Sequence, residues 1–152
     1  MPYFDHNATA PLHSVAREAW VEAYESGWQN PGGPYRSGAR VHVRLNDARE
    51  RLAEILGDHP DQIVFTSGAT ESNNAVIASV ALGASSDDLI AISPTEHPSV
   101  VESARIGWED RVIKLRVDRS GRIDEDFLNE VLVGRRPRLV CIMAANNETG
   151  VL

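Results

Sequence analysis

The sequence contains a single cysteine, Cys141, and a single lysine, Lys114, among its 152 residues. One cysteine excludes an intramolecular disulfide framework and any metal site built from several thiolates. Positive charge is not scarce, because Lys and Arg together number 15, but all except Lys114 are arginines. Any chemistry that needs a lysine amine within these residues therefore depends on Lys114.

Long apolar runs are also missing. No stretch approaches the ~20 residues of a membrane span, and MPYFDHNATA lacks the pattern of a signal peptide. The 22 acidic residues outnumber the 15 basic ones, and a net charge of −7 works against binding to nucleic acid or an anionic membrane. The composition, 42% hydrophobic and 24% charged, is typical of a soluble globular protein of one domain's length. We expect a cytoplasmic protein without a metal site.

Hydrophobic periodicity predicts two N-terminal helices followed by an alternation of strands and helices. Apolar residues recur at helical spacing over residues 14–27 and 39–56, and Gly57 is a typical helix end. The predicted strands are residues 62–66, 89–93, 111–117 and 138–143. The predicted helices between them are residues 68–83, 99–108 and 125–134. Such short connections require a mainly parallel sheet with helices on both faces, a three-layer α/β/α fold.

The four predicted strands differ in pattern. Three contain a continuous apolar run (IVF, LIAI and LVCIM), as in central strands covered by helices on both faces. Residues 111–117 instead alternate, with Lys114 and Arg116 between apolar residues, and are expected at an edge of the sheet. In sheets of this kind ligands bind beyond the carboxyl ends of the strands, so we expect functional residues in the segments that follow the strands.

The segment SGATES, residues 67–72, leads from the first predicted strand directly into a helix. Gly68 allows a ligand to approach the backbone, and the free N–H groups of the first helical turn suit a phosphate, with the Ser67 and Thr70 hydroxyls as further donors. The segment is not a P-loop, because it lacks the second glycine and the Gly-Lys pair. Taken alone, it is more typical of an ordinary helix start capped by Ser67 or Thr70.

Two further polar motifs follow predicted strands. PTEHPS, residues 94–99, holds His97 extended before Pro98, where it can stack on a flat ring or move protons, and Ser99 is a typical helix cap. AANNETG, residues 144–150, offers amide donors and a carboxylate. Taken alone, each motif is more typical of a surface loop. Because all three fall at one rim of one sheet, together they predict a cofactor site.

The segments FTSGATESNN, TEHPSV and NNETGV, preceded by YFDHNATAPL and NPGGPYRSGARV, closely resemble the cysteine desulfurases of the class V aminotransferase family. The resemblance covers essentially the whole chain, in the family's order and spacing. It implies the pyridoxal-phosphate (PLP) fold type I with an incomplete large domain, PLP as cofactor and a homodimer. Residues 1–14 are then an N-terminal arm, and residues 15–152 are the N-terminal part of the PLP-binding large domain.

The resemblance also implies roles for individual residues. Ala69 and Thr70 match the turn that binds the cofactor phosphate. His97 matches the histidine that stacks on the pyridine ring and helps to move protons, and it is the one catalytic residue implied here. Asn147 matches the residue that hydrogen-bonds the phenolic oxygen of the cofactor, and Asn30 matches a position near the substrate carboxylate.

The implied reaction removes sulfur from L-cysteine, leaves L-alanine and forms a persulfide on an enzyme cysteine, from which an acceptor protein takes the sulfur. In the longer family members the Schiff-base lysine and the persulfide cysteine lie beyond NNETGV. Lys114, in mid-strand, and Cys141, inside an apolar strand, match neither, so the fragment alone is expected to be inactive. The alternatives are another class V PLP enzyme, a selenocysteine lyase or an aminotransferase, and a non-catalytic βα binding domain.

Overall fold

The computed structural model describes residues 2–6 and 8–152, so Met1 and Asn7 of the predicted arm lie outside the described residues. Contacts within the chain divide it into two units, Met1–Phe65 and Thr66–Leu152. The predicted boundary after residue 14 stays a prediction. Within the described ranges, no helix combines the length and the apolar character needed to cross a bilayer.

The described residues of the first unit form the helices α1 (Ser14–Ser26) and α2 (Arg36–Leu56) and the 3₁₀ turn η1 (Pro60–Gln62). Both predicted helices are confirmed, although α2 begins earlier than the predicted residue 39. Gly57 ends α2 in the left-handed conformation, with φ of 70°. The Arg44 guanidinium on α2 donates to the Glu22 carboxylate and the Ser26 hydroxyl of α1, each at 2.9 Å. This contact joins the two helices.

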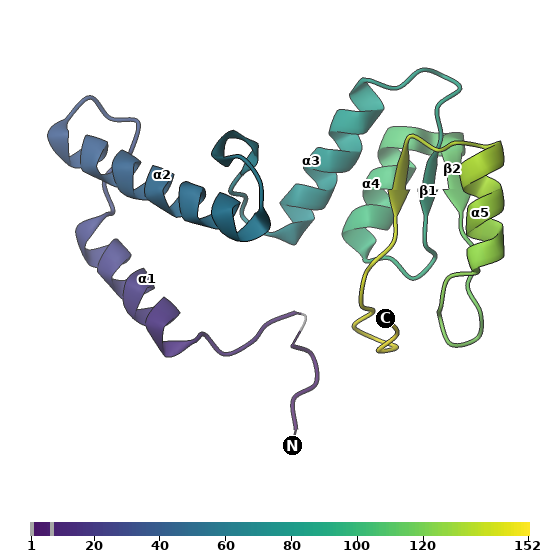
Figure 1. Ribbon diagram of the computed structural model, residues 1–152, viewed down its shortest axis with the longest axis horizontal. Helices are drawn as coiled ribbons and strands as arrows, with labels where there is room; N and C mark the ends of the chain where they lie inside the picture. Colours follow the sequence, from purple (N-terminus) through teal and green to yellow (C-terminus); the bar gives the residue numbers. More distant parts are fainter. Residues whose placement is uncertain (1, 7) are drawn as a thin grey trace. The chain divides into compact units, whose positions relative to one another are not determined.

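The second unit alternates helices and strands (Figure 1). Its elements are α3 (Ala69–Leu82), β1 (Ile90–Ile92), α4 (Pro98–Trp108), η2 (Glu109–Arg111), β2 (Val112–Lys114), α5 (Glu125–Gly134) and β3 (Leu139–Cys141). The three strands form one parallel sheet in the order β2-β1-β3. The predicted edge position of the strand that carries Lys114 is therefore confirmed.

The second unit has three layers, with β1 in the middle (Figure 1). Ile90 and Ile92 pack on one face of the sheet, in a core cluster with Ile77 of α3 and Trp108 of α4. Ala91 faces the opposite side, where it packs with Val131 of α5. This alternation follows from the two-residue period of a strand and places helices on both faces of the sheet.

One strand prediction is wrong, and a second is wrong in part. Residues 62–66 pair with no described strand, and Val64 and Phe65 are 78% and 46% exposed. An apolar run is compatible with a buried strand, but a strand also needs a neighbour that completes its hydrogen bonds. The strand predicted over residues 111–117 ends at Lys114, because Val117 turns away to pair with Ile123 in an antiparallel bridge.

Two expected positions change accordingly. Lys114 is the last residue of β2, at its carboxyl end, and not in mid-strand. β3, expected in the centre of the sheet, lies at its other edge, and its residues are only half-buried. Its continuous apolar pattern is typical of a central strand with helices on both faces. In this sheet, however, β3 has only one neighbouring strand, β1.

Trp108 provides a test of the core. Its side chain is fully buried, yet its indole N–H has no hydrogen-bond partner among the described residues. We expect Trp108→Ala to lower the free energy of unfolding by about 3–5 kcal/mol. Trp108→Phe should cost clearly less, about 2 kcal/mol or below, because it also removes an unpaired buried donor. Urea unfolding followed by circular dichroism measures both.

The control for this test is Trp20→Phe at a 66% exposed position of α1, which should change the free energy of unfolding by less than about 0.5 kcal/mol. Equal losses in the free energy of unfolding for Trp108→Phe and Trp108→Ala would contradict the interpretation that the unpaired indole N–H of Trp108 costs stability.

Candidate functional site

The start of α3 leaves backbone donors open. Gly68 is the N-cap residue, and no side chain caps the helix. The Ser67 amide and hydroxyl donate to the Glu71 carboxylate at 2.7 and 2.6 Å, and these bonds, the hydroxyl first, lower the pKa of Glu71. The capping by Ser67 or Thr70 that is typical of ordinary helix starts is therefore not used. A methyl group added at Gly68 would meet nothing within 4 Å, so the space beside this turn is open.

The loop that follows β1 is fixed by short polar contacts. Ser93 is 1% exposed, and its hydroxyl lies 2.8 Å from that of Thr95. The Glu96 carboxylate accepts the backbone N–H of Met143, beyond β3, at 2.5 Å. Burial raises the pKa of Glu96, against the lowering effects of this bond and of neighbouring His97. The loop after β1 is thereby tied to the segment after β3.

His97 caps α4. Its Nδ1 accepts the backbone N–H of Ser99 at 3.1 Å and lies 2.8 Å from the Ser99 hydroxyl. The Ser99 hydroxyl also lies 2.9 Å from Nδ2 of Asn73 on α3. The sequence pattern favoured Ser99 as the cap. His97 takes that role because Pro98 occupies the first helical position and places Ser99 where its N–H meets the imidazole.

The two consecutive asparagines have different environments. Asn146 is half-buried, and its Nδ2 donates to the Thr95 carbonyl at 3.0 Å. Its Oδ1 accepts the backbone N–H groups of Glu148 and Thr149 at 2.9 and 2.8 Å. Asn147 is exposed. Asn146 thus builds the turn, which leaves the Asn147 amide to face outward.

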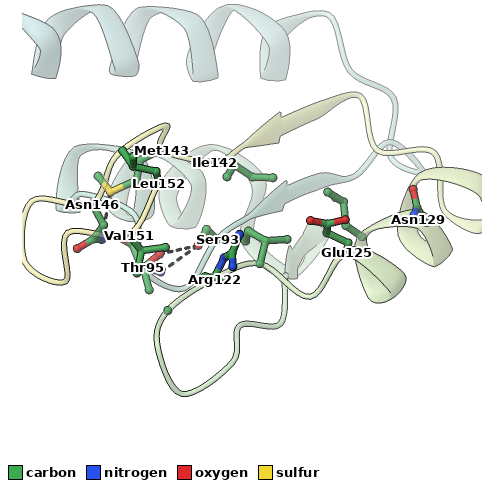
Figure 2. A pocket seen from close by; sticks show the side chains of 13 residues that line it. Ser93, Thr95, Arg122, Glu125, Asn129, Ile142, Met143, Asn146, Val151 and Leu152 are labelled. Carbon is green, nitrogen blue, oxygen red and sulfur yellow. Dashed lines mark hydrogen bonds between the residues drawn. The ribbon is translucent and has the colours of Figure 1, made fainter.

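Three hollows lie around the ends of β1 and β3. One, of about 240 Å³, is lined by both His97 and Asn147. A second, of about 400 Å³, is lined by His97, Asn73, Glu96 and Cys141. Figure 2 shows a third, of about 450 Å³, into which the bonded pair Ser93 and Thr95 projects.

The structure brings two of the four predicted site residues to one hollow, His97 and Asn147. Ala69 and Thr70 are exposed on the first turn of α3 and line none of these hollows, but Asn73 of the same helix reaches Ser99 and so connects to His97. Asn30 lies in the first unit, where its Oδ1 accepts the Gly32 N–H at 2.9 Å, and its predicted role stays a prediction.

Sequence reasoning assigned no site role to Asn73, Glu96 or Ser99. Glu96 and Ser99 belong to the polar segment that follows β1, whereas Asn73 lies inside α3, where no sequence pattern marks it. Cys141 is half-buried, and burial, followed by the charge of Glu96, raises the pKa of its thiol, which disfavours the nucleophilic thiolate. Within the described ranges, no group of three His, Cys, Asp or Glu residues is arranged to hold a metal ion.

Known proteins of one family match nearly the whole chain. The aminotransferase class-V family profile matches residues 2–152. The chain is 35% identical to a selenocysteine lyase of Bos taurus, covering 99% of this chain and 39% of that protein. It is 36% identical to a cysteine desulfurase IscS of Dictyoglomus turgidum, again covering 99% of this chain and 39% of that protein. The chain thus spans about two fifths of the length of these relatives.

Among solved structures, a NifS-like protein matches with a TM-score of 0.85 and 35% identity, covering 96% of this chain and 41% of that chain. The chain therefore has the α/β fold type I of PLP-dependent enzymes, as an incomplete domain with a small parallel sheet.

The carboxyl of Glu96 makes the stability of the protein depend on pH. Because its pKa is raised in the folded state, its favourable contribution is complete below the pKa of the unfolded chain and is lost as pH rises through the folded pKa. We expect Glu96→Gln, which keeps an acceptor for the Met143 amide, to gain stability relative to the wild type between pH 4 and 7. Urea unfolding across this range measures the difference.

The lowered pKa values of Glu71, Asp88 and Asp118 affect both proteins alike and cancel in that difference. Glu18→Gln, at an exposed position of α1, removes the same charge away from this loop and is the control. A stability difference that is constant over the pH range would show that Glu96 is well solvated.

Proposed function

Since the chain belongs to the class-V aminotransferase family, whose members depend on PLP, we propose that it forms the N-terminal part of the PLP-binding large domain of a cysteine desulfurase. The observation that carries the proposal is the shared hollow of His97 and Asn147 beyond the sheet, in the same unit as the open first turn of α3. Relatives named cysteine desulfurase match over nearly the whole chain.

The donors present fit this cofactor. PLP has a phosphate, a phenolic oxygen and a flat aromatic ring, and when bound it supplies an electron sink. The uncapped first turn of α3, with the Thr70 hydroxyl, has the donors that a phosphate requires, and nothing fills the space beside Gly68. The exposed amide of Asn147 suits the phenolic oxygen, and the His97 imidazole suits stacking.

In this proposal the residues divide the work of binding and orienting the cofactor. The Ala69 and Thr70 amides and the Thr70 hydroxyl would bind the phosphate and so anchor one end of the cofactor. Asn147 donates from Nδ2 to the phenolic oxygen and orients the ring. His97 stacks on the ring and holds a proton at Nε2, because its Nδ1 is occupied by Ser99. Asn146 acts only through the turn that presents Asn147.

The proposed substrate is L-cysteine, with L-alanine as product and the sulfur passed through an enzyme persulfide to an acceptor protein. Cys141 does not suit the persulfide role, because burial keeps its thiol protonated. Lys114 is exposed on the edge strand β2 and lines none of the hollows around His97. We propose that both reactive residues lie elsewhere in the protein, and that it acts as a homodimer.

Cofactor binding provides the first test. We expect the chain to bind PLP more tightly than pyridoxal, which lacks the phosphate, in a fluorescence titration. Thr70→Val should weaken PLP binding about tenfold or more, since it removes a hydrogen bond to a charged group, and should leave pyridoxal binding unchanged. Ser79→Ala, at an exposed position of the same helix, is the control.

The same samples, treated with borohydride and mapped by mass spectrometry, should show no stoichiometric adduct at Lys114. Equal affinities for PLP and pyridoxal would contradict the proposal that the first turn of α3 binds the phosphate. An adduct at Lys114 would contradict the proposal that the Schiff-base lysine lies elsewhere in the protein.

A second candidate function is selenocysteine lyase, because relatives with that name are also about 35% identical to the chain. Alanine release from L-cysteine and from L-selenocysteine, measured on the protein that contains these residues, separates the two. A desulfurase releases alanine from both substrates, whereas a strict lyase releases it only from L-selenocysteine. We expect activity on L-cysteine.

A further inference from the structure

Three side chains form a continuous hydrogen-bonded path from α3 to the candidate site. Asn73 Nδ2 lies 2.9 Å from the Ser99 hydroxyl, and that hydroxyl lies 2.8 Å from Nδ1 of His97. Ser99 is 9% exposed and Asn73 is half-buried, so solvent competes little for these groups. From this path we propose that Ser99 and Asn73 are positioning residues, which hold the neutral His97 ring in the tautomer that carries its proton on Nε2.

The donors and acceptors along the path fix its direction. The backbone N–H of Ser99 can only donate, so Nδ1 of His97, 3.1 Å away, must be an acceptor without a proton. Asn73 Nδ2 also only donates, so it occupies a lone pair of the Ser99 hydroxyl and leaves the hydroxyl proton for Nδ1. Nδ1 thus receives two hydrogen bonds, and the ring proton stays on Nε2.

A comparison with two other histidines shows which hydrogen bond at Nδ1 is particular to His97. His13 and His59 also accept a backbone N–H two residues ahead, but each at the longer distance of 3.4 Å. Neither receives a side-chain hydroxyl at Nδ1 in the described structure. The second donor and its partner on α3 are specific to His97, so helix capping alone does not account for the path.

A neighbouring pair shows that the path is more than a link between helices. The Ser103 hydroxyl of α4 donates to Asn74 Oδ1 of α3, joining the same two helices one turn further along. Ser103 and Ser99 are equally exposed, at 9%. Ser103 does not touch His97, so it provides a matched control for any purely structural effect.

The consequence at the site is chemical. A ring held in this form presents an N–H donor at Nε2, and it accepts no proton at Nε2 while Ser99 occupies Nδ1. If the proposed function holds, His97 therefore meets the cofactor and substrate as a hydrogen-bond donor. For Nε2 to act as a base, the ring must first lose its proton from Nε2 and gain one on Nδ1, and the Ser99 hydroxyl must turn to accept a hydrogen bond from the new Nδ1–H.

Nitrogen-15 NMR of the histidine-labelled chain, recorded above pH 8, reads the tautomer of each ring directly. In the wild type we expect His97 to carry its proton on Nε2. Ser99→Ala should raise the Nδ1–H to Nε2–H ratio about fivefold, the factor that one ordinary hydrogen bond is worth. Ser99→Thr, which keeps the hydroxyl, should restore the wild-type spectrum. Asn73→Asp should shift the ratio in the same direction as Ser99→Ala, because a carboxylate draws the hydroxyl proton away from His97.

Ser103→Ala should leave the His97 resonances unchanged, and His13 and His59 should stay constant in every variant. A wild-type His97 with its proton on Nδ1 would overturn the proposal, and so would equal effects of Ser99→Ala and Ser103→Ala. If Ser99→Ala fails to fold, the Thr and Asp variants decide the question. Because the spectra need no cofactor, a failure to bind PLP would leave the tautomer result intact, and the two proposals fail separately.

Discussion

The buried central strand is the constraint on which the second unit depends. Each residue of β1 is buried, because strands flank both of its edges and helices cover both of its faces. A strand held on four sides has a fixed carboxyl end, so Ser93, directly after it, is 1% exposed. The polar loop that carries His97 begins at this fixed point. Apolar packing therefore sets where the site lies, before any polar contact within it forms.

Polar contacts then set how the site residues are oriented. Glu96 binds the Met143 amide and Asn146 binds the Thr95 carbonyl, so the segments after β1 and β3 hold each other. Each bond adds only about 1 kcal/mol to stability, far less than the buried core contributes. These hydrogen bonds mainly fix the orientation of the side chains, because a half-buried donor or acceptor can be satisfied in only a few orientations. This division between packing and orientation is common where a rigid scaffold presents functional loops.

The same division explains what could be predicted from the sequence. The helices follow from periodicity and the central strand from a continuous apolar run, and these predictions hold for all five α-helices and for β1. Ile63, Val64 and Phe65 form an apolar run like that of β1 but pair with nothing described, because apolar character does not encode a partner strand. The His97 and Asn147 motifs could be placed at one rim by the parallel topology alone. The path through Ser99 and Asn73 could not, because it joins residues 26 positions apart through the packing of two helices.

The Asn146–Asn147 pair shows why a motif needs a structure before its residues can be given roles. Residue type and position alone do not distinguish the two asparagines, and the assignment of a ligand contact to Asn147 comes from the family resemblance. The backbone N–H groups of Glu148 and Thr149 both point to Oδ1 of Asn146, and the Thr95 carbonyl takes its Nδ2, so that side chain is fully used within the protein. Only Asn147 is left exposed beside the hollow that His97 lines. The Asn146 side chain shapes the turn through its own hydrogen bonds and also lines this hollow, whereas the Asn147 amide is exposed beside it, so replacing Asn146 would disturb the turn that presents Asn147.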